Sequence, residues 1–154
     1  MKVGIIVHSL TGHTLSVANL LEDKLTADGH QVVLESLVSE PEQPSDISKV
    51  NLQNIPDVSG YDAVFFGAPV WAFSPSSVMR AYLQQIPSLA EKRAGCFVTQ
   101  AFPFAWMGGN SSIRIMKELC EDKGAEVLHT GIINWGRKKR DATIADVTEL
   151  LSSF

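Results

Sequence analysis

The stretch KVGIIVHSLTGHT, residues 2–14, decides the fold that this sequence predicts. Its first six residues form a β-branched, apolar run that is typical of a parallel strand covered on both faces. The run stops at His8, and small hydroxyl residues and Gly12 follow before an amphipathic pattern begins. This order predicts a strand over 2–7, a polar loop over 8–14, and a helix over 14–27 that Gly29 ends.

Further along the chain, strand-type runs alternate with helix-type patterns. Strands are predicted over 30–38, 61–69, 94–102 and 125–135. Helices are predicted over 74–86, 111–124 and 141–154. The first of these has Ser74 as its N-cap and Pro75 at its first position, and the second is capped by a serine and ended by Gly124. Three prolines within 38–60 indicate a long and mostly irregular crossover there.

This alternation implies parallel pairing through right-handed crossovers. Five strands in 154 residues predict an α/β fold, with a five-stranded parallel sheet in a three-layer α/β/α sandwich that forms one domain over 1–154. At five strands the natural strand order is the flavodoxin-like one, 2-1-3-4-5. Ligands of such a sheet bind beyond the carboxyl ends of the strands where the order reverses, here between the first and third strands.

Composition narrows the function further. The net charge of −4 argues against a nucleic-acid partner, and no apolar run is long enough for a membrane span. The N-terminus lacks the pattern of a signal peptide, so we expect a cytoplasmic protein. Cys96 and Cys120 fit no disulfide framework and are expected to be buried free thiols. No spacing of His, Cys, Asp and Glu suggests a metal site.

The loop over 8–14 has the features of a phosphate site. It leads into a helix N-terminus, where backbone N–H groups are free and the helix dipole favours an anion. Ser9, Thr11 and Thr14 add hydroxyl donors, and Gly12 allows close approach of the backbone. Because the loop contains no Lys or Arg, neutral dipoles would hold the phosphate.

Two further loops at the same sheet edge carry five aromatic residues. Trp71 and Phe73 follow the third strand, and Phe102, Phe104 and Trp106 follow the fourth. Two aromatic walls beside a phosphate site form a slot for a flat ring with a phosphate tail, since aromatic rings stack on such a ring.

The motif SLTGHT, residues 9–14, resembles the flavodoxin phosphate-loop pattern Ser/Thr-x-Thr-Gly-x-Thr at the end of the first strand. Its position, the five βα units and the chain length are similar to a short-chain flavodoxin along the whole chain. The resemblance implies a flavoprotein that binds FMN non-covalently. Carried over by position, the implied FMN contacts are Ser9, Leu10, Thr11, Gly12, His13 and Thr14 at the phosphate; Ala68, Pro69, Val70, Trp71, Ala72 and Phe73 on one ring wall, with Trp71 as the stacking residue; and Gln100, Ala101, Phe102, Phe104, Trp106, Gly108 and Gly109 on the other.

Three functions are compatible with the sequence. The resemblance favours an electron-transport protein that shuttles electrons between redox partner proteins, in which no side chain is catalytic. The run over 70–75 has neither the glycine nor the acidic residue that flavodoxins often carry after the tryptophan. It is more similar to FMN-dependent oxidoreductases that take hydride from NAD(P)H and reduce quinones or similar small acceptors. The basic run over 137–140 is a candidate contact for such a nucleotide. The third function is a non-redox binding domain. We expect a monomer or weak dimer that binds neither nucleic acid nor membrane.

Overall fold

The computed structural model describes residues 1–101, 104, 106–136 and 140–154. Its long strands are β1 (Lys2–Val7), β2 (Gln31–Ser36), β3 (Ala63–Trp71), β5 (Arg93–Gln100) and β6 (Glu126–Asn134). Its helices are α1 (His13–Ala27), α2 (Ser77–Gln85), α3 (Gly109–Asp122) and α4 (Arg140–Leu151). The short elements are the 3-10 helix η1 (Ile47–Lys49) and the two-residue strand β4 (Ser74–Pro75).

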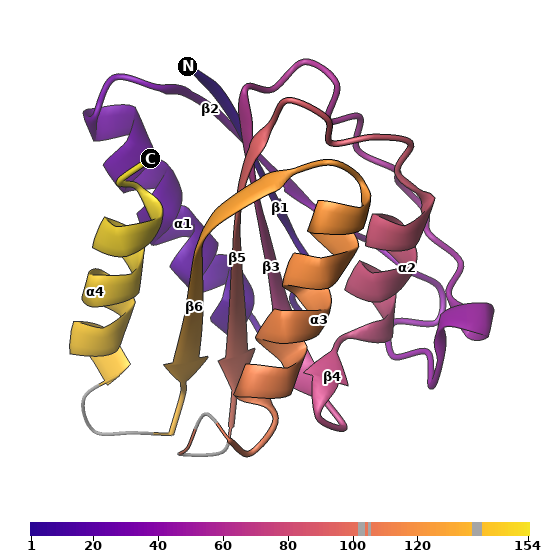
Figure 1. Cartoon of the computed structure of the whole chain (residues 1–154). Helices are drawn as coiled ribbons and strands as arrows, with labels where there is room; N and C mark the ends of the chain where they lie inside the picture. The colour runs from indigo at the N-terminus through magenta and orange to yellow at the C-terminus, as the bar shows by residue number, and fades with distance from the viewer. Residues whose placement is uncertain (102–103, 105, 137–139) are drawn as a thin grey trace.

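The strand order confirms the predicted topology. The five long strands follow the order β2-β1-β3-β5-β6, which is the expected 2-1-3-4-5 once the short β4 is set aside. All four pairings between them are parallel. Helices α1 and α4 cover one face of the sheet and α2 and α3 cover the other, as in a three-layer sandwich (Figure 1). The order reverses between β1 and β3, and the loops that follow the strands gather at one end of the sheet.

Two apolar cores lie on the two faces of the sheet. One contains Ile6, Val64 and Phe66 packed against side chains of α2 and α3, and the other contains Ile5 and Phe65 packed against α1 and α4. Alternate residues of β1 and β3 thus serve opposite cores, and this explains why both strands are apolar along their length. Within the described ranges, no helix combines the length and apolarity that a bilayer span needs.

The predicted buried thiols are confirmed. Cys96 and Cys120 are both free and buried, and their Sγ atoms lie 3.8 Å apart between β5 and α3. The hydrogen bond with the neighbouring Cys120 thiol, and then burial, raise the pKa of Cys96 well above its ordinary value, so this thiol stays protonated and unreactive.

The predicted start of the helix over 74–86 is wrong. Ser74 and Pro75 form β4, which pairs antiparallel with Trp71 and Val70 at the end of β3. The helix begins at Ser77, and Ser76 is its N-cap, because the Ser76 hydroxyl accepts a hydrogen bond from the amide of Met79 at 3.3 Å. Three serines and a proline over 74–77 offered more than one possible start, and pairing with β3 excluded the earlier one.

The tip of this β3–β4 hairpin has an unusual backbone. Ala72 and Phe73 both lie in the left-handed region, with φ of 49° and 64°. A two-residue turn of this kind is common in hairpins but usually contains Asn or Gly, so the sequence gives no signal for it. The Ser111 hydroxyl of α3 donates a hydrogen bond to the Phe73 carbonyl at 2.6 Å and holds the tip.

The start of α3 also differs from the prediction. Gly108 stands at the N-cap with φ of 117°, and the helix begins at Gly109, ahead of Ser111 and Ser112, one of which was expected to cap it. A Cβ at Gly108 would lie 3.0 Å from the Val70 side chain and 3.2 Å from the Phe73 backbone. Close packing of this turn against the hairpin therefore sets the helix start.

Replacing Tyr82 with Phe should lower the free energy of unfolding by about 1 kcal/mol. The buried Tyr82 hydroxyl donates a hydrogen bond of 2.7 Å to the Pro56 carbonyl and ties the irregular crossover to α2. Chemical denaturation of both proteins measures the difference. Tyr61→Phe is the matched control, because the Tyr61 hydroxyl makes no hydrogen bond to the described residues. An equal loss in both variants would contradict the prediction.

Candidate cofactor site

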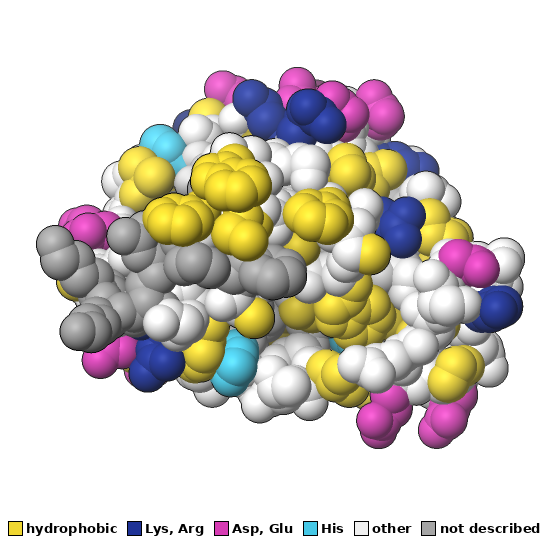
Figure 2. Space-filling view, turned by 90° about the horizontal axis from the view of Figure 1, so that it is seen from below, with side chains coloured by type: hydrophobic (Ala, Val, Ile, Leu, Met, Phe, Trp, Pro, Cys, Tyr) yellow, Lys and Arg dark blue, Asp and Glu magenta, His cyan; other side chains and the backbone are white. Residues whose placement is uncertain are grey.

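The three predicted loops meet in one cleft at the carboxyl end of the sheet. The cleft has a volume of about 240 Å³. Its lining residues are Leu10, Thr11, His13, Thr14, Gln43, Pro69, Val70, Trp71, Thr99, Gln100 and Ala101. Figure 2 views this end of the molecule and shows hydrophobic side chains across its middle, with most charged side chains toward the margins. The cleft therefore lies at the switch point, on a largely uncharged face.

One end of the cleft presents unpaired backbone donors. The amide N–H groups of Thr11, Gly12 and His13 donate no hydrogen bond to any described residue. Gly12 has φ of 92°, and a Cβ built there would have no neighbour within 4 Å, so the backbone is open on that side. Together with the dipole of α1, these groups suit an anion such as a phosphate.

Two hydroxyls of the loop take part in its own structure. The Ser9 hydroxyl accepts a hydrogen bond from the amide of Leu15 at 3.2 Å, so it replaces the cap that Gly12 cannot supply. Thr14 is buried, and its Oγ1 lies 2.8 Å from Oγ1 of Thr99 on β5. This pair uses one of its two hydroxyl hydrogens internally, which leaves one for a ligand in the cleft.

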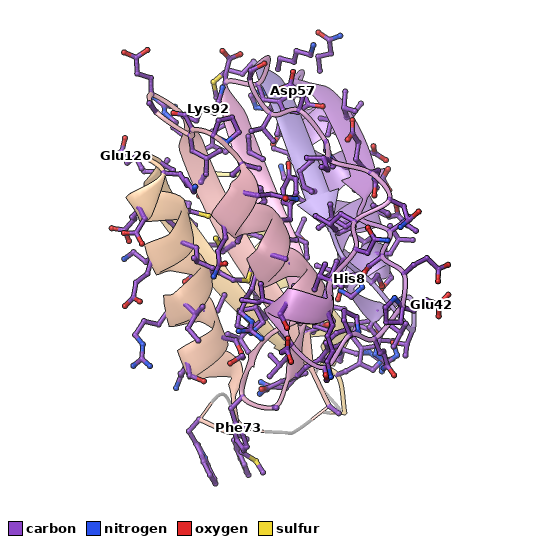
Figure 3. The ribbon with its side chains drawn as sticks, turned by 90° about the vertical axis from the view of Figure 1, so that its right-hand side faces the viewer. His8, Glu42, Asp57, Phe73, Lys92 and Glu126 are labelled. Atoms are coloured by element: carbon purple, nitrogen blue, oxygen red, sulfur yellow. The ribbon has the colours of Figure 1, made fainter. Side chains whose placement is uncertain are left out.

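The other end of the cleft is bounded by Trp71. Its ring packs edge-on against the imidazole of His8, with centroids 5.2 Å apart. The His8 Nδ1 lies 2.8 Å from the Ser76 hydroxyl, which caps α2. Burial lowers the pKa of His8 to about 4, so this side chain is neutral at pH 7. Figure 3 shows His8 at the same end of the sheet as Phe73.

An unpaired acceptor lies on the wall formed by β5. Gln100 is buried, and its Nε2 donates hydrogen bonds to the Phe104 carbonyl and to Oδ1 of Asn134. Its Oε1 has no hydrogen-bond partner among the described residues. This oxygen is itself buried and lies beside the start of α3, since a Cβ built on Gly109 would be 3.2 Å from it.

Several predicted contacts lie away from the cleft lining. Ala68 is fully buried in the core, and Gly109 is buried at the start of α3. Ala72 and Phe73 form the hairpin tip, and Gly108 packs against that tip. The remaining predicted residues of the 100–109 loop are exposed or outside the described residues: Phe104 and Trp106 stack on each other with centroids 6.1 Å apart, and Phe102 is not described.

Three residues near the cleft were not predicted from the sequence. Gln43 comes from the irregular crossover, whose path no sequence pattern fixes. Thr99 is the partner of Thr14, and Trp135 follows β6 and stacks on His13. Trp135 stands at the carboxyl end of a predicted strand, which is the position that could have indicated it. Of the basic run, Arg140 begins α4, and 137–139 lie outside the described residues.

Comparisons with known proteins agree on the fold. No protein-family model matches the chain. A solution structure of two-electron reduced flavodoxin from Megasphaera elsdenii has a TM-score of 0.70 at 23% identity, with 99% of each chain covered. A flavodoxin of Streptococcus pneumoniae TIGR4 has a TM-score of 0.70 at 16% identity, again with 99% of each chain covered. A flavoprotein from Lactobacillus acidophilus in complex with FMN has a TM-score of 0.63 at 19% identity, with 96% of this chain and 98% of that chain covered.

The topology and these similarities define the fold class of the protein. The chain has a flavodoxin-like fold, as the sequence predicted. Among the described residues, no group of three or more His, Cys, Asp or Glu side chains is placed to hold a metal ion.

Proposed function

We propose that the protein binds FMN non-covalently in this cleft and transfers electrons between redox partner proteins. The observation that carries the proposal is the meeting of unpaired amides at Thr11–His13 with the Trp71 ring in one cleft. The structural neighbours support it, since they include a reduced flavodoxin and a flavoprotein in complex with FMN. Bound FMN supplies the redox chemistry, and the chain supplies binding, orientation and shielding.

The residues present fit FMN at both ends. At the phosphate end, the free amides around Gly12 and the spare hydroxyl hydrogen of the Thr14–Thr99 pair are donors for phosphate oxygens. At the ring end, Trp71 offers an aromatic wall. This division matches a ligand that is anionic at one end and flat and apolar at the other.

The surface around the cleft supports transfer to another protein. Phe73 and Trp106 are 60% and 72% exposed. The three loops of the site, 8–14, 67–75 and 100–109, contain no Asp, Glu, Lys or Arg. A partner protein would therefore approach an aromatic, uncharged face, and exposed patches of this kind are typical of interaction sites. The free thiols support a cytoplasmic location, where the environment is reducing.

Titration of the apoprotein with FMN tests the proposal. We expect one FMN per chain, with a submicromolar Kd, measured by quenching of flavin fluorescence. Such an affinity requires more than about 8 kcal/mol of binding free energy, which a phosphate site and a stacked ring supply together. A protein that stays colourless and shows no binding at micromolar FMN would contradict the proposal.

A second experiment separates the carrier from an NAD(P)H oxidoreductase. The holoprotein is mixed anaerobically with NADPH or NADH, and the visible flavin absorption band is followed. We expect slow or no bleaching with either nucleotide and full bleaching with dithionite. Rapid bleaching by a nicotinamide nucleotide would replace the electron-carrier proposal with that of an FMN-dependent oxidoreductase acting on quinones or similar small acceptors.

A further inference from the structure

An aromatic stack joins the phosphate end of the cleft to the far edge of the sheet. The His13 imidazole lies on the Trp135 indole, with centroids 4.0 Å apart and planes inclined by 12°. The Arg140 guanidinium lies 4.7 Å from the centroid of the same indole. The contact thus connects the first residue of α1 with the segment that follows β6 and with the first residue of α4.

Two hydrogen bonds to its main-chain groups fix Trp135 in this place. Its amide donates to the Gln100 carbonyl at 2.7 Å, which extends the pairing of β5 and β6 past the end of β6. Its carbonyl accepts a hydrogen bond from Nη1 of Arg140 at 3.1 Å. Both main-chain polar groups of Trp135 are therefore hydrogen-bonded, and its indole offers a fixed surface to His13.

The stack lies next to Gly12, the loop residue with the greatest conformational freedom of its backbone. Gly12 precedes His13 and has a left-handed backbone, and a Cβ built on it would have no neighbour within 4 Å. Glycine loses more conformational freedom on folding than other residues, so a loop that turns on it needs a contact on either side to stay in place. Ser9 supplies one through its bond to the Leu15 amide, and the stacked His13 supplies the other.

We propose that Trp135 is the positioning residue of the phosphate end of the cleft. Its indole holds the His13 ring, and through it the amides of Thr11–His13, in the arrangement that receives a phosphate monoester. The inference rests on the proposed binding of FMN and adds a specific consequence: Trp135 contributes to the affinity for FMN but little to that for riboflavin, which has the same ring and no phosphate.

Replacing Trp135 with Ala and with Phe tests this role. Dissociation constants for FMN and riboflavin are measured on the apo forms of the full chain. Loss of an aromatic stack of this size should weaken FMN binding about tenfold in Trp135→Ala, while riboflavin binding changes less than about threefold. Trp135→Phe keeps a flat ring and should stay within about threefold of the unsubstituted protein for both flavins.

A double-mutant cycle tests whether Trp135 affects the affinity for FMN through His13. His13→Ala should weaken FMN binding about as much as Trp135→Ala, and the double variant should lose little more than either. Additive losses would show that Trp135 does not act through His13. Equal losses for FMN and riboflavin, or an unchanged FMN affinity in Trp135→Ala, would overturn the positioning role.

Flavin binding by the unsubstituted protein distinguishes failure of the positioning role from failure of the proposed FMN binding. If it binds FMN and Trp135→Ala keeps the full preference for FMN over riboflavin, the positioning role fails and FMN binding stands. If the unsubstituted protein binds neither flavin, both proposals fail. Thermal unfolding of each apoprotein is measured alongside, since a variant that is merely less stable should lose affinity for both flavins together.

Discussion

Replacing Thr11 with Glu should weaken FMN binding more than 100-fold, or by about 3 kcal/mol. Thr11 is exposed and lines the cleft next to the unpaired amides of the loop. A carboxylate there would repel the phosphate and compete with it for the same N–H groups. Because the loop contains no Lys or Arg, no neighbouring cation in it would offset the added charge.

Thr11→Gln is the control for this substitution. It has the size of the Glu variant without the charge, so we expect FMN binding within about fivefold of the unsubstituted protein. Both variants should bind riboflavin as the unsubstituted protein does, because riboflavin carries no phosphate. Equal loss in Thr11→Glu and Thr11→Gln would show that size and not charge causes it, and would place the phosphate elsewhere.

Lowering the pH from 7 to 5 should cost about 2 kcal/mol of stability through His8 alone. Burial lowers the pKa of His8 from 6.5 to about 4. The unfolded chain therefore binds a proton at this residue below pH 6.5, while the folded chain does not until pH falls near 4. Stability from this group is complete above pH 6.5 and is lost as the pH falls through that window.

His8→Asn isolates this contribution. The Asn amide can occupy the place of Nδ1 beside the Ser76 hydroxyl but does not titrate. Urea denaturation at several pH values should give a flatter dependence between pH 7 and 5 for the variant, by about the same 2 kcal/mol. Parallel curves for the two proteins would mean that His8 is protonated equally in the folded and unfolded states.

The sequence predicted the fold well because the signals for it are local. Apolar β-branched runs mark the buried strands, and Gly29 and Gly124 both stand in the left-handed conformation just beyond the ends of α1 and α3. The predictions that were wrong lie where tertiary packing chose between similar local options. Ser76 caps α2 in place of Ser74, and Gly108 precedes α3 because the turn packs against the hairpin.

The site was predicted less completely, for a related reason. The loop over 8–14 and Trp71 could be placed because each stands at the carboxyl end of a buried strand at the switch point. The stack of His13 on Trp135 joins residues from opposite ends of the chain, and the Thr14–Thr99 pair joins a helix to a distant strand. Neither contact leaves a periodic pattern. The exposed positions of Phe73 and Trp106 likewise follow from the hairpin and the α3 turn, which the sequence does not specify.

The tight turn at Ala72 and Phe73 has a consequence for how this region can vary. Trp71 is the last residue of β3 and pairs with Ser74, so the turn between them contains only two residues. Side chains alternate between the two faces of a strand, so a shift of one residue in β4 would change which of its side chains lie opposite Trp71 and Val70. The number of residues at this tip is consequently as restrictive as their identity: a loop one residue longer would have to absorb the addition as a bulge, or else the pairing of β4 with β3 would shift.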